Sequence, residues 1–300
     1  MAASWRRCAR QHSLDPDVTP DMHRLPDTEL LECRQEMEPL LRSAFPALER
    51  LQGATGDHGV CQLLTNADGI SLHWSGAAGD EAELQAWGLC RGVDWSEAAS
   101  GTNGVGTSLI ERRTLVVQHE HHYYARALKI TCISAPVFDH AGTLAGAVNV
   151  TFYGSTSTQA PAGLLASAVA DTARQIEIDH FHHHFHDARI SSLPWALRCG
   201  AVLLATDRDD VIVGASRGAR HVLGLNDAAI REGVIAADRI HALANRVEDD
   251  GLDTAEHGAL RRALLRERGN VTAASRRLGV SLATIKRKIS HRHLERRSRN

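Results

Sequence analysis

The chain has 300 residues, of which 43 % are hydrophobic and 23 % charged, as in ordinary globular proteins of two or three domains. No apolar run is long enough to cross a bilayer, and residues 1–10 carry charges without the apolar core of a signal peptide. The six cysteines are widely spread without a C-x-x-C pair, so we expect free thiols in the cytoplasm and neither a disulfide framework nor a zinc site.

Charge is unevenly distributed along the chain. Residues 257–300 hold 13 Lys and Arg against 2 Asp and Glu, whereas the other 256 residues hold 21 and 34. The formal net charge of −2 therefore combines +11 at the C-terminal end with −13 elsewhere. Such segregation predicts a polyanion-binding segment on an acidic body. A disordered basic tail is the alternative, which the residue pattern restricts to the last positions.

The N-terminal part predicts a helix followed by a hairpin. SWRRCARQHSLDP, residues 4–16, belongs to a helical lead that we place at residues 1–26. VCQLLTNADGISLHW, residues 60–74, predicts two strands joined by a turn, because Asp-Gly between apolar runs is a strong hairpin signal.

The stretch GTNGVGT, residues 101–107, is rich in glycine like a nucleotide-binding loop. It lacks the Lys of G-x-x-x-x-G-K-[ST], and its spacing is G-x-x-G-x-G instead of G-x-G-x-x-G. We therefore expect a turn and a helix start that line a cavity, with phosphate binding as the alternative. Asn103 and Thr107 are candidates to orient a ligand there, although either residue equally suits a turn or a cap.

A second hairpin is predicted by CISAPVFDHAGTLAGAVNVTFY, residues 132–153, with its turn around residues 139–142 and β-branched flanks. One long helix is predicted over residues 161–186. Helix, antiparallel strands and closing helix describe an α+β sensor-type domain, which we place at residues 27–186.

The middle of the chain predicts a smaller β-containing segment. Residues 194–225 favour a strand, an Asp-rich turn, a second strand and a short helix. This order resembles the start of a PAS fold, but too few residues follow to complete one. Residues 231–253 are acidic and weakly periodic, as in a linker. We therefore assign residues 187–253 to a PAS-like remnant and linker.

Three helices are predicted within residues 254–300. The first covers residues 254–267. The second starts after Asn270, a good N-cap, and ends at Gly279, which is able to adopt the left-handed conformation. Ser281 caps the third. Helix, glycine turn and helix is the helix-turn-helix arrangement, whose last helix enters the DNA major groove.

The third helix presents the expected DNA-reading face. Ile285 and Ile289 set its inward side at about 100° per residue. Arg287 then points outward and is the candidate for a bidentate contact to guanine, whereas Arg276 and Arg277 suit phosphate contacts. A three-helix cap with solvated charges is the alternative. The predicted DNA-binding residues are Arg276, Arg277, Ser281, Ala283, Thr284, Lys286, Arg287 and Lys288.

GNVTAASRRLGVSLATIKRKI, residues 269–289, resembles the Fis-type helix-turn-helix at the C-terminus of many bacterial enhancer-binding regulators. One departure is Leu282, where that family often has Arg or another polar residue. By the helical count Leu282 leans towards the core of the domain.

SWRRC…LDP, WSEAASGTNGVGT (residues 95–107) and ITCISAP (residues 130–136) together resemble the GAF sensor domain of acetoin-regulator-type bacterial activators. The resemblance covers residues 4–186 and implies a cavity for a small effector. We assign the effector site to Trp95, Asn103, Thr107, His122 and Cys132.

Activators of that type carry a large central AAA+ ATPase domain with a Walker A loop and a loop that contacts sigma-54. Here the two resembling stretches are joined without room for such a domain, and no Walker A pattern occurs. The resemblance therefore implies a regulator that works without ATP hydrolysis. A modulator that hetero-dimerises with a full-length activator is the alternative.

Two histidine-rich stretches are HEHHYY, which begins at His119, and DHFHHHFH, which ends at His186. On a helix His180 and His184, or His182 and His186, lie one turn apart, the spacing of metal ligands. The alternatives are a cavity rim for the first stretch and a helix surface or dimer seam for the second, with a pH response as a further option. We predict no metal and no cofactor.

Cys90 and Cys132 admit an enzyme hypothesis, because some GAF-fold proteins are cysteine-dependent reductases of a small sulfoxide. Neither cysteine has a neighbouring sequence feature that would activate its thiol. We predict no catalytic residue and no enzymatic activity.

The predicted fold is thus α+β: a GAF-type antiparallel sheet with flanking helices, a PAS-like linker segment and an all-α C-terminal helix-turn-helix. The predicted function is that of a bacterial, cytoplasmic, homodimeric transcription regulator whose DNA binding responds to a small effector.

Overall fold

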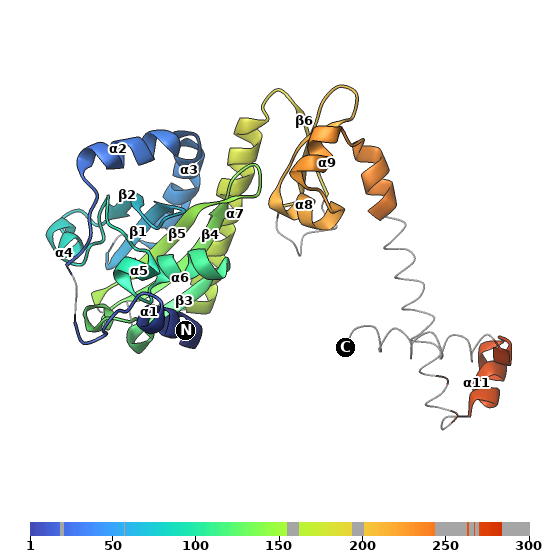
Figure 1. The fold of residues 1–300 in the computed structure, drawn as a ribbon, viewed down its shortest axis with the longest axis horizontal. Coiled ribbons are helices and arrows are strands. Elements are labelled where there is room, and N and C mark those ends of the chain that lie inside the picture. Colours follow the sequence, from blue (N-terminus) through green and yellow to red (C-terminus); the bar gives the residue numbers. More distant parts are fainter. Residues whose placement is uncertain are drawn as a thin grey trace. The chain divides into compact units, whose positions relative to one another are not determined.

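The computed structural model describes residues 1–18, 21–56, 58–154, 162–193 and 201–243, and near the C-terminus residues 263, 267 and 270–283. The chain divides into two compact units, Met1–Ala236 and Ala237–Asn300 (Figure 1). Predictions for residues 19–20, 57, 155–161, 194–200, 244–262, 264–266, 268–269 and 284–300 lie outside the described residues.

A five-stranded antiparallel sheet forms the centre of the first unit, with strand order β2-β1-β5-β4-β3. Both predicted hairpins are confirmed. The β1–β2 turn passes through Gly69, whose φ of 91° favours glycine, and the β4–β5 turn closes with Asp139 N–H donating to the Thr143 carbonyl. The strands are β1 Val60–Asn66, β2 Ser71–Gly76, β3 Leu115–Gln118, β4 Thr131–Phe138 and β5 Leu144–Phe152.

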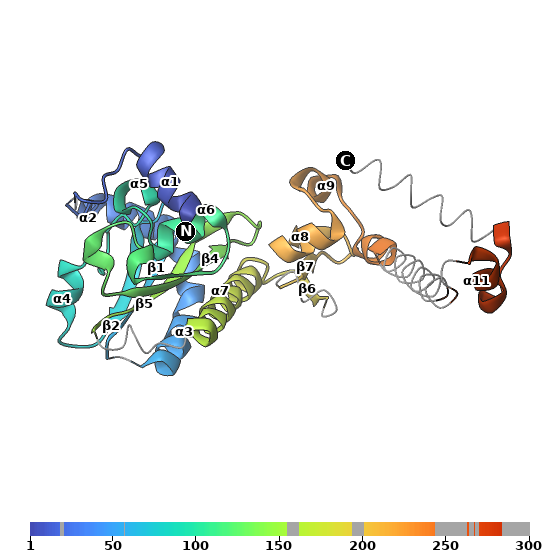
Figure 2. The ribbon, with the colours of Figure 1, turned by 90° about the horizontal axis from the view of Figure 1, so that it is seen from below.

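Helices cover both faces of this sheet. Figure 2 shows α3 and α7 together on one face and α1, α5 and α6 on the other. The predicted long helix is α7. The helices are α1 Ala2–Arg10, α2 Asp27–Glu36, α3 Glu38–Thr55, α4 Glu81–Ala86, α5 Glu97–Ser100, α6 Gly104–Glu111 and α7 Ala162–His184, with short 3-10 turns η1 His119–His121 and η2 Ala125–Ala127.

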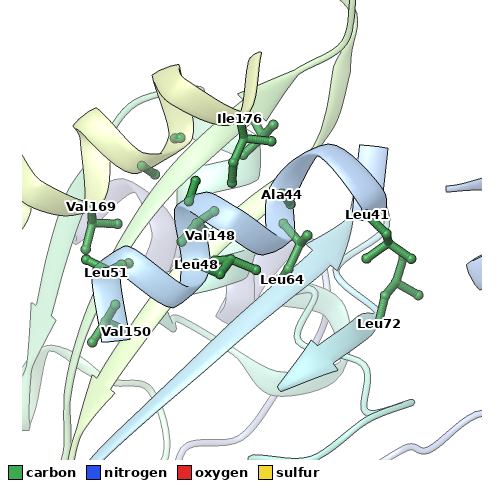
Figure 3. Packing of buried hydrophobic residues seen from close by; sticks show 14 of the residues in the cluster. Leu41, Ala44, Leu48, Leu51, Leu64, Leu72, Val148, Val150, Val169 and Ile176 are labelled. Atoms are coloured by element: carbon green, nitrogen blue, oxygen red, sulfur yellow. The ribbon is translucent and has the colours of Figure 1, made fainter. Parts of the chain in front are cut away.

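Strand alternation decides which side chains meet α3 and α7. Successive residues of a strand point to opposite faces, so Leu64 of β1 and Val148 and Val150 of β5 point towards these helices. Leu48 and Ile176 meet them from α3 and α7 in an apolar layer (Figure 3). Each large aliphatic side chain buried here contributes about 1.5–3 kcal/mol to folding.

The opposite face of the sheet explains the glycine-rich stretch. A Cβ on Gly104 would lie 2.7 Å from the Cβ of Cys132, and one on Gly106 would lie 2.6 Å from the Trp95 carbonyl oxygen. Gly101 ends α5 with a φ of 64°. The glycines therefore allow α6 to approach the sheet and the 95–97 segment closely, as expected for a turn and helix start.

A second, three-stranded antiparallel sheet of order β6-β7-β8 completes the first unit. Phe181 at the end of α7 packs against Leu203 of this sheet, and the Phe185 ring fills the space that a side chain on Gly214 would take. Its elements are β6 Arg189–Ser192, β7 Leu203–Thr206, β8 Ile212–Ala215, α8 Arg217–Leu223 and α9 Asp227–Glu232.

Residues 231–236 differ from the linker expected to start at Arg231. Ile235 forms a bridge with Val211, and Ala236 is buried, so this stretch closes the small sheet. Residues 236–243 are helical. Apolar residues spaced for one bridge and about two helix turns are too few to give a periodic signal in the sequence.

The second unit contains α11, Val271–Leu278, as predicted for the second helix of the helix-turn-helix. The Asn270 side chain accepts hydrogen bonds from the backbone N–H groups of Thr272 and Ala273, and Gly279 ends the helix with a φ of 65°. Residues 282–283 are helical directly after Ser281. Leu282 is 36 % exposed, and its expected lean towards the core of the domain stays a prediction, because most of that domain lies outside the described residues.

Candidate functional site

A cavity of about 450 Å³ lies between the sheet and the chain that covers it on the α6 side. Its floor is the sheet face that carries Leu63, Cys132 and Thr151. One wall comes from residues 86–105 and the other from the loop at residues 122–130. A cavity of this size falls in the range that small-molecule sites occupy, roughly 300–1,000 Å³.

Polar side chains on the floor are held by bonds to one another. Asn149 Nδ2 donates to Thr151 Oγ1 at 2.8 Å, and Ser134 Oγ donates to Asn149 Oδ1 at 2.6 Å. The Cys132 Sγ lies 3.5 Å from Thr151 Oγ1. The floor therefore presents a hydrogen-bonded row whose groups already have partners within the protein.

The Asn103 side chain stabilises the cavity wall through hydrogen bonds to the backbone. Its Oδ1 accepts from the Gly106 N–H at 2.9 Å, which caps α6, and its Nδ2 donates to the carbonyls of Trp95 and Gly101 at 2.9 and 2.8 Å. Both polar atoms of the amide are thus used inside the protein. Of the two roles expected for Asn103, the geometry favours the cap.

Trp95 and His122 face the same cavity from its two walls. Trp95 Nε1 and His122 Nε2 are buried and have no hydrogen-bond partner among the described residues. The other ring nitrogen, His122 Nδ1, lies 3.1 Å from the His119 carbonyl oxygen. Burial lowers the pKa of His122 to about 4, so its ring is neutral at physiological pH.

Thr107 lies outside the cavity lining, in contrast to the other four effector-site residues predicted from the sequence. Its hydroxyl is 3.2 Å from Ser4 Oγ, which donates to Glu97 at 2.5 Å. Position 107 is on α6, and the helix turns this side chain towards α1. The sequence gives residue spacing on α6 but not which side of α6 meets α1.

The first helix fastens the cavity walls from outside. Arg7 forms two hydrogen bonds with the Glu97 carboxylate, at 2.8 and 3.0 Å. Trp5 Nε1 donates to the His121 carbonyl at 3.0 Å, and the Trp5 ring packs on Tyr123 with centroids 4.8 Å apart. Residues 1–10 therefore contact both the α5 segment and the loop that forms the second wall.

These contacts were missed by the sequence argument. SWRRC marks the N-terminal stretch as distinctive, but the partners Glu97 and Tyr123 lie about a hundred positions away, and no local pattern connects them.

The cysteines give no support to the reductase alternative. Burial raises the pKa of the Cys132 thiol to about 11 and also raises that of Cys90. A thiolate is the nucleophilic form, and such thiols remain protonated at neutral pH.

The histidines of the two histidine-rich stretches lie in different environments. His119–His121 form the exposed turn η1, whereas His122 enters the cavity. His180 and His184 lie on one side of α7, where His140 joins them from the β4–β5 turn with its Nδ1 3.3 Å from His180 Nε2. Within the described ranges no group of three His, Cys, Asp or Glu side chains is arranged to hold a metal ion.

Some of the residues predicted to bind DNA lie within the described part of the chain, and others lie outside it. Arg276 and Arg277 are exposed in the last turn of α11, and Arg277 pairs with Glu267 at 2.8 Å. Ser281 and Ala283 are exposed. Thr284, Lys286, Arg287 and Lys288 lie outside the described residues, so their contacts stay predictions.

Comparison with known families matches both ends of the chain. The family described as MimR, N-terminal domain, matches residues 1–177, and the one described as Bacterial regulatory protein, Fis family, matches residues 251–290. A sheet-based sensor domain and a Fis-type helix-turn-helix define a DNA-binding transcription regulator. The chain belongs to the family of proteins with the MimR N-terminal domain.

Relatives with curated names agree with this class. The acetoin catabolism regulatory protein of Cupriavidus necator is 30 % identical over 259 residues, which are 83 % of this chain and 38 % of that protein. The propane 2-monooxygenase operon transcriptional activator MimR of Mycolicibacterium smegmatis is 31 % identical over 135 residues, 45 % of this chain and 22 % of its own. The chain thus spans well under half the length of these relatives.

The fold also has a counterpart among solved structures. A crystal structure of the E. coli DhaR(N)–DhaL complex matches with a TM-score of 0.53 at 16 % identity, covering 75 % of this chain and 76 % of that one. This likeness confirms the predicted sensor fold. None of the described helices is both long and apolar enough to span a membrane.

Proposed function

We propose that a small effector binds in the 450 Å³ cavity and changes the affinity of the protein for DNA. The observation that carries this proposal is the cavity itself, which opens in the sensor domain beneath two walls that α1 fastens. An effector shifts DNA binding only if it binds one arrangement of the chain more tightly than another. Movement of the 122–130 wall is the change that occupancy would bias.

We propose that the protein binds DNA as a homodimer. Two Fis-type helix-turn-helix segments related by two-fold symmetry would present their recognition helices about 34 Å apart to a two-fold related DNA site. The basic surplus at residues 257–300 suits contacts to phosphates. The long helix α7 and the C-terminal unit are the elements that we assign to the dimer contact.

We propose that regulation proceeds without ATP hydrolysis. The sequence contains no Walker A pattern, and residues 178–250, between the two matched ranges, are too few for an ATPase domain. Burial keeps the thiols of Cys90 and of Cys132, which lines the cavity, protonated, and the proposal includes neither an enzymatic reaction nor a cofactor. The proposed compartment is the cytoplasm, where the thiols stay reduced.

A cavity-filling variant tests the proposal. Ala127 lines the cavity, and Ala127→Phe would occupy part of it, whereas Ala78→Phe changes an exposed loop residue and is the matched control. We expect small alcohols, ketones and acids, acetoin among them, to include one that changes the DNA affinity of the wild type and of the control. Ala127→Phe should lose this response. If no compound changes the DNA affinity of the wild type, and Ala127→Phe binds DNA as the wild type does, effector control is contradicted.

A second candidate is a modulator that hetero-dimerises with a full-length activator. The observation in its favour is that one chain shares the sensor and the Fis-type segment with the much longer acetoin regulator. Such a modulator should co-purify with an ATPase-containing partner from its native cells. A homodimer that binds a specific site alone would remove this candidate.

A further inference from the structure

Two unpartnered polar atoms belong to residues that line the cavity. Trp95 is 8 % exposed and His122 is 3 % exposed, and both line the cavity. Trp95 Nε1 and His122 Nε2 lack a hydrogen-bond partner among the described residues. Buried polar groups in native proteins are nearly always paired, so two unpaired ones on residues that line one cavity point to a partner that enters it.

The chemistry of each atom is fixed. The indole N–H of Trp95 is only able to donate. The His119 carbonyl that lies 3.1 Å from His122 Nδ1 is only able to accept, so Nδ1 carries the ring proton. His122 Nε2 then bears a lone pair and accepts. The residues that line the cavity therefore offer one unpaired donor and one unpaired acceptor.

The other residues that line the cavity further restrict which chemical groups a ligand can carry. Asn103 and Asn149 spend their amide groups on bonds within the protein, whereas Trp95 Nε1 and His122 Nε2 stay unpaired among the described residues. The residues lining the cavity include Arg126 and Lys129 but no Asp or Glu, so an ammonium group finds no counter-charge there. A carboxylate satisfies Trp95 but sets a second acceptor against the lone pair of His122.

We propose that the cavity selects a small molecule without a cationic group through a hydroxyl group that donates to His122 Nε2, with this oxygen or a neighbouring one accepting from Trp95 Nε1. This inference rests on the proposed function and names the ligand class for the same cavity. A hydroxyl both donates and accepts, whereas a ketone of the same shape only accepts and leaves His122 unpaired. Unpaired buried groups are the strongest source of discrimination between such analogues.

Three probes of one shape separate the possibilities: cyclohexanol, cyclohexanone and cyclohexanecarboxylate, each titrated into the ¹⁵N-labelled full chain. The chain has five tryptophans, and the indole resonance lost in Trp95→Phe identifies Trp95. We expect cyclohexanol to bind about tenfold more tightly than cyclohexanone. Binding should move the Trp95 indole resonance downfield, as a new hydrogen bond requires.

Two variants assign the roles. Trp95→Phe keeps an aromatic ring without the N–H and should weaken the alcohol and the ketone alike, by about tenfold each. His122→Asn keeps a donor towards the His119 carbonyl without Nε2, and should remove the preference for alcohol over ketone while ketone affinity stays the same. Trp74→Phe, in the same core but outside the cavity lining, is the control and should change neither affinity.

The outcomes distinguish this inference from the proposed function. Equal or tighter binding of the ketone or the carboxylate, or binding that leaves the Trp95 resonance in place, overturns the hydroxyl assignment while the cavity stays a binding site. If no probe moves any cavity resonance, the proposed effector function fails, and this inference fails with it. Thermal unfolding of each variant shows that lost binding is not lost folding.

Discussion

At the scale of single residues, the most constrained group is the Glu97 carboxylate. Glu97 is 1 % exposed and receives hydrogen bonds from Arg7 and Ser4. Burial alone would raise its pKa, but the bonds from Arg7, Ser4 and Thr107 lower it below its usual range. A lowered pKa stabilises the fold above the pKa of an unfolded Glu, and this contribution is lost as pH falls through the folded pKa.

Arg7→Met tests this pair. Removing one partner of a buried ion pair leaves an uncompensated carboxylate, so we expect the free energy of unfolding at pH 7 to fall by about 3 kcal/mol. The folded pKa of Glu97 then rises, and the deficit should shrink between pH 7 and pH 4. Denaturant unfolding at both pH values measures it. Arg6→Met, its exposed neighbour, is the control, and an equal or pH-independent loss in both variants would refute the assignment.

Asn103 makes a second residue-scale prediction. Asn103→Ala removes the α6 cap and two bonds to the wall that carries Trp95, so we expect a loss of about 2 kcal/mol. Asn226→Ala removes an exposed cap of α9 and should cost about 1 kcal/mol or less. Chemical denaturation compares the two. Equal costs would mean that the buried bonds of Asn103 contribute nothing beyond capping.

At the scale of elements, α6 is placed by the two glycines that let it approach its neighbours. A Cβ on Gly106 would meet the Glu97 backbone nitrogen and the Trp95 carbonyl oxygen, each at 2.6 Å. Backbone atoms do not give way as a flexible side chain does. This close approach holds the backbone of Trp95 beside the cavity. The packing of α6 therefore helps to set the geometry of the site.

Gly106→Ala should therefore destabilise the protein by about 1–3 kcal/mol through overpacking. Gly53→Ala, inside α3 with nothing within 4 Å, should be neutral or stabilising by up to about 1 kcal/mol, because alanine favours helix. Thermal unfolding of both variants gives the comparison. A stabilised Gly106→Ala would show that α6 is packed more loosely than the structure has it.

The elements show where sequence reasoning succeeds and where it stops. Asp-Gly in the β1–β2 turn and the caps Asn270 and Gly279 are local signals, and the structure confirms them. The site depends on contacts between distant segments. Thr107 faces Ser4, and Trp95 faces the cavity with His122, because of how α1 and the 122–130 loop pack on the sheet. No local period encodes these pairings. Four of the five positions assigned to the effector site line the cavity, whereas the contacts of α1 with the cavity walls were not predicted.

At the scale of the whole molecule, the segregation of charge agrees with the two matched families. The acidic body contains the MimR-type sensor, and the basic C-terminal segment overlaps the Fis-type range 251–290. Each phosphate neutralised by Lys or Arg lowers the logarithm of the affinity by about 0.9 per tenfold increase in salt. The proposed boundary at residue 254 predicts that the basic segment alone accounts for this salt dependence.

The central claim is most directly tested by selecting fragmented genomic DNA with the purified chain at two salt concentrations, with and without residues 254–300. The account predicts enrichment of a two-fold related site that persists at the higher salt and is lost on truncation, while the truncated chain keeps its folded sensor domain. Uniform binding that vanishes at the higher salt, or enrichment of the same site by the truncated chain, would contradict it.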